Sequence, residues 1–175
     1  ERLGLLGVGS ILDYSVEGKE DEVEFDHSCK EILSTVKRAQ FDPNIPFSVF
    51  KVTGLGRIVL LEKVSNKDQL SSEEAAEYSR VRERVRKICE EGYHLNVRVF
   101  IDAEETWIQP AIDEMTTQMM EKYNKEKAII YNTVQLYRHD RLAFVKTSHQ
   151  RAVEGNYFLG LKLVRGAYME KERER

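Results

Sequence analysis

Polar side chains of the kind that bind ligands stand at the ends of several apolar, β-rich runs. They are Lys51, Asp102, Gln135, Tyr137, Lys162 and Arg165, with Gly166, Ala167 and Tyr168 directly after them. Together they supply cations, one carboxylate, one amide and a phenol. Such a set suits an anionic ligand that carries a polar heterocycle, because both the charge and the ring heteroatoms find partners.

The sequence lacks recognisable motifs for hydrolases and for metal sites. No Ser–His pairing, nucleophile elbow or Cys–His arrangement has supporting context. No H-x-H, H-E-x-x-H or C-x-x-C pattern indicates a metal site, so we expect none. The histidines stand in helix or loop contexts and receive no catalytic role: His27, His94, His139 and His149.

Short β-rich runs alternate along the chain with longer helical patterns. The runs are Ile11–Val16, Phe47–Thr53, Leu95–Asp102, Ala128–Tyr137 and Phe158–Tyr168. Apolar residues recur at helical spacing between them, around residues 25–36, 78–89, 108–119 and 141–153. Ser71 with Glu74 predicts a capping box at the start of the second helix, and Gly92 is a candidate for its end. Strands separated by helices predict parallel pairing.

The parallel sheet could be open or closed into a barrel. Gly7-Val8-Gly9 precedes a strand, which is poor evidence for a dinucleotide-binding sheet. In the third run Arg98, Phe100 and Asp102 share one face, while Val97, Val99 and Ile101 share the other. That pattern favours a (β/α)8 barrel, in which one strand face meets helices and the other points into the lumen.

The length of the chain fits only part of such a barrel. A complete barrel takes about 250 residues, and the chain has 175. We therefore interpret residues 1–175 as strands one to five with their helices, the N-terminal portion of one barrel domain with its C-terminal portion absent. The charged run at residues 170–175 resembles the start of another helix. We expect this portion alone to be inactive, because five strands would leave two unpaired sheet edges.

Composition excludes several classes of protein. The net charge of −3 offers no basic surface for nucleic acid. No apolar run approaches the roughly 20 residues that span a bilayer. Cys29 and Cys89 fall within helical patterns and indicate core positions rather than a disulfide. Trp107 and the cluster of Met115, Met119 and Met120 are more typical of helix packing than of cofactor contacts.

Each strand-end residue also has a purely structural interpretation. Lys51 could be a surface lysine that buries only its methylene groups. Asp102 could cap the following helix, where Glu104 and Glu105 would favour the N-terminus. Gln135 could satisfy a backbone group of a loop.

The strand ends also resemble one known family, the proline dehydrogenases. The fifth-strand segment Leu161–Tyr168 (LKLVRGAY) is similar to that family's signature. Similar segments follow in order for the other four strands: Leu12–Glu17 (LDYSVE), Phe50–Gly56 (FKVTGLG), Phe100–Glu105 (FIDAEE) continued by Gln109–Ala111, and Asn132–Tyr137 (NTVQLY). Single motifs of this kind are weak, but one per strand in the right order is strong.

The resemblance implies a distorted (β/α)8 barrel with non-covalent FAD. It implies oxidation of L-proline to 1-pyrroline-5-carboxylate, with electrons passed to a quinone. Gln135 would bind the flavin ring and Lys162 would lie near flavin N5, where many bacterial members have arginine. Arg165, Gly166 and Ala167 would run along the cofactor. Lys51, Asp102 and Tyr168 would surround the substrate, and Met169 stands where some bifunctional members have tryptophan.

Two other interpretations stay open at this point. A barrel enzyme could act on another small anion, such as a phosphorylated one, with Lys51 and Arg165 as anchors. A helix-rich interaction module could present Arg80–Arg86 to a partner, although that run is also typical of a solvated charged face. For an enzyme that uses quinone we expect a cytoplasmic location with peripheral membrane contact, or the mitochondrial matrix and inner membrane in a eukaryote.

Overall fold

The chain folds into one parallel sheet with helices between successive strands. The computed structural model describes residues 2–14, 20–103, 105–166 and 169–174. In chain order the elements are η1 (Gly4–Leu6), β1 (Ile11–Asp13), α1 (Glu22–Gln40), β2 (Phe47–Lys51), η2 (Val52–Gly54), α2 (Ile58–Asn66), α3 (Ser72–His94), β3 (Arg98–Asp102), α4 (Gln109–Tyr123), β4 (Ile130–Gln135), α5 (Arg141–Glu154), β5 (Leu161–Val164) and α6 (Met169–Arg173).

The five strands lie in sequence order, β1-β2-β3-β4-β5, and every neighbouring pair is parallel. Each falls within the run that predicted it and is shorter than that run. The expected helices are present as α1, α3, α4 and α5, and α6 starts one residue before the charged run at 170–175. Helix α2 was not predicted by the sequence analysis.

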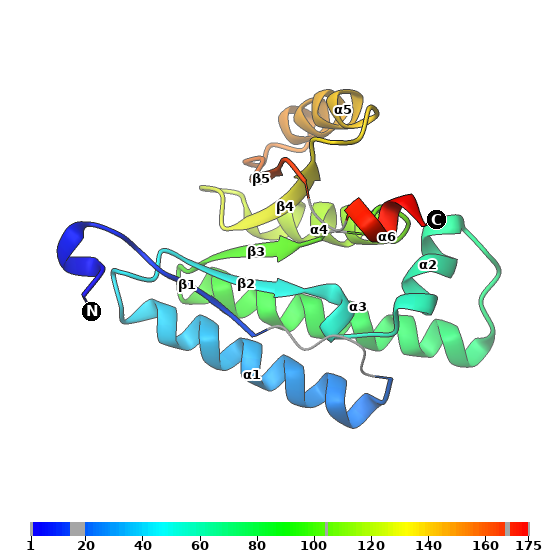
Figure 1. The fold of residues 1–175 in the computed structure, drawn as a ribbon, viewed down its shortest axis with the longest axis horizontal. Helices are drawn as coiled ribbons and strands as arrows, with labels where there is room; N and C mark the ends of the chain where they lie inside the picture. The colour runs from blue at the N-terminus through cyan, green and yellow to red at the C-terminus, as the bar shows by residue number, and fades with distance from the viewer. Residues whose placement is uncertain (1, 15–19, 104, 167–168, 175) are drawn as a thin grey trace.

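Helices α1, α3 and α4 cover one face of the sheet (Figure 1). The core lies between them and the strands, and it includes Ile32 of α1, Val85 and Ile88 of α3 and Ile112 of α4. Ala152 of α5 joins the same core beyond β4. This one-sided layering is the arrangement expected for part of a (β/α)8 barrel, because an open doubly wound sheet carries helices on both faces.

The two faces of β3 differ as the sequence alternation predicts. Val99 and Ile101 are fully buried against the helices, whereas Arg98 is exposed and Phe100 is half-buried on the opposite face. On that opposite face the Phe47 ring stacks on Phe100 with centroids 4.2 Å apart, and Tyr131 meets both rings edge-on. The lumen-facing side of the sheet is therefore aromatic in the layer that precedes the carboxyl ends of the strands.

The capping box of α3 is confirmed, and the predicted end of that helix is wrong. The Ser71 hydroxyl accepts from the Glu74 backbone N–H, and the Glu74 carboxylate accepts from the Ser71 backbone N–H. The helix passes Gly92 and ends at His94. A Cβ on residue 92 would lie 2.5 Å from Val99 Cγ2, so glycine there lets α3 approach β3 closely.

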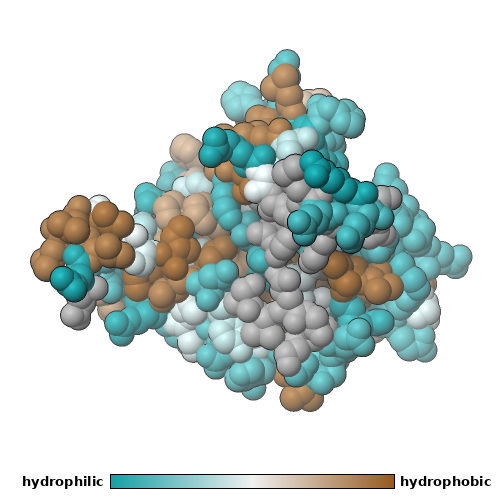
Figure 2. All heavy atoms as spheres, viewed as in Figure 1, coloured by the Kyte–Doolittle hydropathy of each residue, from teal (hydrophilic) through white to brown (hydrophobic). Residues whose placement is uncertain are grey.

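Apolar side chains remain exposed at both ends of the described chain. Leu3, Leu5, Leu6 and Val8 form a hydrophobic group around η1, the brown cluster at the left of Figure 2. Leu163 of β5 is also exposed. No helix within the described ranges is both long and apolar enough to cross a membrane.

Candidate active site

A row of polar side chains crosses the lumen-facing side of the sheet near the carboxyl ends of the strands. Lys51 of β2 is in register with Asp102 of β3, and Thr133 of β4 is in register with Lys162 of β5. Asp102 and Thr133 are joined by a hydrogen bond, Oγ1 to Oδ1, of 3.2 Å. The strand alternation and register thus bring three of the predicted site residues, Lys51, Asp102 and Lys162, into one layer.

Asp102 is the centre of this row. Its carboxylate accepts the Lys162 ammonium at 2.6 Å, and the backbone N–H of Ala103 lies 3.1 Å from Oδ1. Only 8% of the residue is exposed, so this charge is largely shielded from water. The alternative that Asp102 caps the following helix is wrong, because α4 begins at Gln109, seven residues further on, with Ile108 in the N-cap position.

The aromatic level described above lies directly beneath the row. The Lys162 ammonium is 5.9 Å from the centroid of the Phe100 ring. Phe100 and Phe47 therefore form an apolar floor under the charged groups. Such a floor excludes water from below and strengthens the electrostatic interactions above it.

Gln135 ends β4 and has no exposed surface. Its carboxamide oxygen accepts from Arg138 Nη1 at 3.3 Å. A neutral amide so completely buried requires hydrogen-bond partners on both its donor and its acceptor side.

The rest of the predicted cofactor segment lies just beyond β5. Arg165 and Gly166 are exposed, and a Cβ added to Gly166 would meet no atom within 4 Å. Open space around an exposed Gly166 is compatible with a ligand that lies along the backbone there. Ala167 and Tyr168 lie outside the described residues. Tyr137 is half-buried in the loop after β4.

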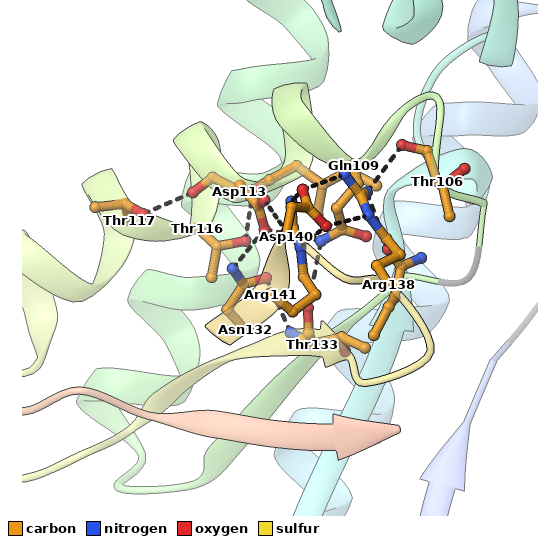
Figure 3. Close-up of polar contacts among 12 residues, drawn as sticks. Thr106, Gln109, Asp113, Thr116, Thr117, Asn132, Thr133, Arg138, Asp140 and Arg141 are labelled. Atoms are coloured by element: carbon orange, nitrogen blue, oxygen red, sulfur yellow. Dashed lines mark hydrogen bonds and ion pairs between the residues drawn. The ribbon is translucent and has the colours of Figure 1, made fainter. Parts of the chain in front are cut away.

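A second polar cluster, which the sequence analysis missed, lies behind the row (Figure 3). Asp113 of α4 accepts from Gln109 Nε2 and Asn132 Nδ2, each at 2.8 Å, and from Arg141 Nη1 at 2.9 Å. Arg141 also binds Asp140, with its shorter contact at 2.6 Å. We call these five residues the Asp113 clasp; they join α4, β4 and α5.

The protonation of the clasp carboxylates follows from their surroundings. Hydrogen bonds from Arg141, and to a lesser extent from Arg138, hold the pKa of Asp140 well below its usual range. Burial raises the pKa of Asp113, and the three hydrogen bonds that it accepts act against that rise. The sequence gives little indication of the Asp113 clasp, because its residues come from three separate segments. Only Gln109 and Asp113, four residues apart on one helix, are close enough in sequence to be recognised as neighbours.

Other residues that the sequence analysis singled out lie outside these two clusters. Cys29 and Cys89 are free and buried, and burial raises the pKa of both thiols, as expected for core residues. Met115 and Met120 are buried in the core, which confirms helix packing. No group of metal-ligating side chains occurs among the residues that the structure describes.

The charged run at residues 80–86 is a solvated face only in part, because Arg80, Arg82 and Glu83 are exposed but Arg84 is not. Arg84 is buried, with Nε bound to Asp26 at 2.8 Å and Nη1 bound to the Leu55 carbonyl at 3.0 Å, and it also pairs with Glu22. Arg80 pairs with Glu22 at 2.8 Å. This part of α3 ties α1 to the loop after β2, so its most buried cation is not available to a partner.

The parallel sheet and the row of polar side chains together define a class of protein. It is an α/β protein of the barrel type with charged side chains at the carboxyl ends of its strands. The comparison with known families makes this more specific. The sequence model described as "Proline dehydrogenase" matches residues 1–175, and the chain belongs to that family.

Individual relatives agree with this assignment. The chain is 36% identical over 167 residues to "Carbapenem antibiotics biosynthesis protein CarD" of Pectobacterium carotovorum, covering 95% of this chain and 44% of the relative. It is 37% identical over 183 residues to "Proline dehydrogenase 1, mitochondrial" of Caenorhabditis elegans, covering 100% of this chain and 28% of the relative. The chain thus spans less than half the length of these curated relatives.

Solved structures show the same fold. Proline utilization A from Bdellovibrio bacteriovorus, inactivated by N-propargylglycine, superposes with a TM-score of 0.80 at 17% identity, over 99% of this chain and 19% of that one. A mutant of Bradyrhizobium japonicum proline utilization A gives 0.78 at 15% identity, over 97% and 17% of the two chains. The parallel five-stranded sheet is therefore the fold found in these proteins.

Proposed function

We propose that the complete protein oxidises L-proline to 1-pyrroline-5-carboxylate, the first step of proline catabolism. The family membership supports the reaction. The observation that carries the proposal is the row in which Lys51, Asp102 and Lys162 meet on the lumen-facing side. Residues 1–175 would supply the N-terminal portion of the barrel domain, and the remaining part would complete the site.

The row suits a small amino acid. Its two lysines supply ammonium groups of the kind that bind a substrate carboxylate. In our proposal Lys51 pairs with that carboxylate, and Asp102 holds neighbouring groups by charge-assisted hydrogen bonds. Tyr168 completes the substrate side, as the family resemblance implies. The aromatic floor of Phe47 and Phe100 would keep water away from the reacting carbon.

The donors present also fit a flavin, which we propose to be FAD. When bound, the flavin accepts the hydride equivalent that leaves C5 of proline, and the protein supplies orientation and electrostatics. In our proposal Gln135 recognises the flavin ring, as the family resemblance implies, and the Lys162 cation favours the electron-rich reduced ring. Arg165, Gly166 and Ala167 would follow the rest of the cofactor, with open space at Gly166.

Electron delivery to a quinone and peripheral contact with a membrane complete the proposed role. Several relatives carry the word mitochondrial in their names. For a eukaryotic source we therefore propose a mitochondrial location. For a bacterial source we propose a cytoplasmic enzyme that binds peripherally to the membrane.

A second candidate is oxidation of another small anionic substrate. One relative, similar over 95% of this chain, is named for antibiotic biosynthesis rather than for proline catabolism. In this alternative Lys51 and Arg165 anchor the anion, and the same row and cofactor serve a different ring.

Purified full-length protein distinguishes the two candidates. Flavin content is measured by absorbance, and dye reduction is followed with L-proline, with hydroxyproline and with proline derivatives that carry further ring substituents. Stoichiometric flavin with preferred turnover of L-proline is the expected result. Turnover of a derivative but not of L-proline would favour the second candidate, and protein without flavin would contradict both.

A further inference from the structure

Thr133 of β4 connects the row of polar side chains to the Asp113 clasp. Successive residues of a strand point to opposite faces of the sheet, so Asn132 belongs to the clasp and Thr133 to the row. The Thr133 backbone is bonded to clasp residues at both ends: its N–H donates to Asn132 Oδ1 at 2.9 Å, and its carbonyl accepts from Gln109 Nε2 at 3.3 Å. Figure 3 shows Thr133 beside Asn132 on β4. The point from which the Thr133 side chain projects is therefore fixed.

The hydroxyl of Thr133 lies between two acceptors. It is 2.9 Å from the Ile101 carbonyl oxygen and 3.2 Å from Asp102 Oδ1. A hydroxyl has one proton, so the two acceptors share it. The carboxylate gains from this more than a neutral acceptor would, because its hydrogen bonds are charge-assisted. Thr133 has no exposed surface and a β-branched side chain, so its hydroxyl is not free to turn away.

Asp102 transmits this contact to Lys162. Three donors converge on Asp102 Oδ1: the Lys162 ammonium at 2.6 Å, the Ala103 backbone N–H at 3.1 Å and the Thr133 hydroxyl at 3.2 Å. Within the ion pair the Lys162 side chain is 28% exposed and the Asp102 side chain 11%. The ammonium is therefore the part of the pair that reaches the open side of the sheet, and the carboxylate beneath it holds it there.

We propose that Thr133 is a positioning residue, whose hydroxyl fixes the Asp102 carboxylate and, through it, the Lys162 ammonium. This inference rests on the proposed function, in which that cation lies beside the flavin ring. Thr133 touches neither substrate nor cofactor. Without the hydroxyl, Oδ1 loses one of its three donors, and the ion pair is held less firmly in the geometry that favours the reduced ring. The competing explanation is that the hydroxyl serves only the Ile101 carbonyl and stiffens the pairing of β3 with β4.

Two substitutions separate the hydroxyl from the shape of the side chain. Thr133→Val removes the hydroxyl and keeps the branched shape, whereas Thr133→Ser keeps the hydroxyl. Thr116→Val is the matched control, because Thr116 is equally buried and its hydroxyl donates to a carbonyl of its own helix, that of Ile112, at 2.8 Å. The full-length protein with bound flavin is used. The measurements are kcat/KM for L-proline by dye reduction, the reduction potential of the flavin, and Tm.

We expect Thr133→Val to lower kcat/KM by about threefold to tenfold, the range of one hydrogen bond. The flavin potential should become more negative, in the same direction as in Lys162→Met and by a smaller amount, because a displaced cation stabilises the reduced ring less. In an Asp102→Ala background Thr133→Val should have no further effect on either quantity, since both residues act through one contact.

The remaining variants test whether the effect belongs to the hydroxyl. Thr133→Ser should retain most of the parent kcat/KM and the parent potential. Thr116→Val should leave both unchanged, even where it lowers Tm as much as Thr133→Val does. If Thr133→Val does not fold, Thr133→Ala takes its place and is compared with Thr133→Ser.

An unchanged kcat/KM or an unchanged potential in Thr133→Val would overturn the inference. Equal losses in Thr133→Val and Thr133→Ser would do the same, as would a full further loss when Thr133→Val is added to Asp102→Ala. These outcomes favour a structural role at the Ile101 carbonyl. A parent protein that binds no flavin, or that binds flavin without oxidising L-proline, would instead contradict the proposed function itself, and the inference would fall with it.

Discussion

Asp102 and Asp113 are equally buried, at 8% exposure each, yet their surroundings differ in kind. Asp113 accepts three side-chain hydrogen bonds from three elements, one of them from a buried guanidinium. Asp102 lies at the carboxyl end of its strand, in a row of lysines and above an aromatic floor. The first environment holds helices to the sheet, whereas the second concentrates charge where a barrel binds its substrate.

This contrast shows that burial of a carboxylate does not by itself indicate whether it belongs to a structural cluster or to a candidate site. What separates the two is the kind of element that supplies the partners and the face on which they stand. The Asp113 partners lie between α4, β4 and α5, on the side of the sheet that the helices cover. The Asp102 partners lie on neighbouring strands, on the side that faces the lumen.

The largest expected effect follows removal of the Asp113 carboxylate. Asp113→Ala would leave the Arg141 guanidinium buried with one partner fewer, and breaking a buried pair costs about 3–5 kcal/mol. Urea denaturation of the full-length protein should show the loss. Glu114→Ala is the control, because its exposed pair with Arg151 spans 3.6 Å and contributes at most about 1 kcal/mol. Equal midpoints for the two variants would contradict the structural role of the clasp.

Asp102→Ala should affect catalysis more than stability, the opposite of what we expect for Asp113→Ala. We expect kcat/KM for proline to fall by at least about tenfold, or about 1.4 kcal/mol of transition-state stabilisation, with a much smaller change in the free energy of unfolding. Steady-state dye reduction and urea denaturation measure the two quantities. Arg98→Ala is the control on the other end of the same strand face. A variant with normal kinetics would remove Asp102 from the site.

Lys51→Ala tests the other side of the row. Loss of a cation that pairs with the substrate carboxylate in both ground and transition states should raise KM by about fivefold to tenfold, with a smaller change in kcat. Steady-state kinetics over a range of proline concentrations measure the split. An unchanged KM would mean that the carboxylate is bound elsewhere in the complete barrel.

Much of this arrangement is local enough to be predicted from the sequence. Period-2 alternation in Arg98–Asp102 fixes which side chains face the helices, and polar residues at strand ends indicate where a site forms. Ser71 and Glu74 define a helix start within four residues. Helix α2 was missed because its short apolar run has no clear period, and short runs of this kind are ambiguous.

Features that depend on distant partners were not predictable. Gly92 resembles a helix end, but its role comes from the approach of Val99 on the next strand. Arg84 stands in a charged run, yet its carboxylate partners lie on α1, 58 residues away in the case of Asp26. Thr133 was overlooked as well, since only the sheet register brings its hydroxyl to Asp102.

The smallest expected effect is the pH-dependent contribution of Asp140, the most exposed carboxylate of the Asp113 clasp, to the free energy of unfolding. Asp140 has a folded pKa below its ordinary value near 3.8. A depressed folded pKa contributes stability that is present above the unfolded pKa and is lost as pH falls through the folded one. The side chain is 42% exposed, so solvent screening keeps the contribution below about 1 kcal/mol.

Asp140→Asn should therefore lower the free energy of unfolding slightly at about pH 7, and the difference from the parent should shrink as pH falls below the ordinary Asp value. Urea denaturation of parent and variant at a series of pH values measures this difference directly. Other acidic groups that titrate in the same range largely cancel in the comparison, because both proteins carry them. A difference that stays constant down to about pH 2 would show that the charge of Asp140 is not what stabilises the clasp.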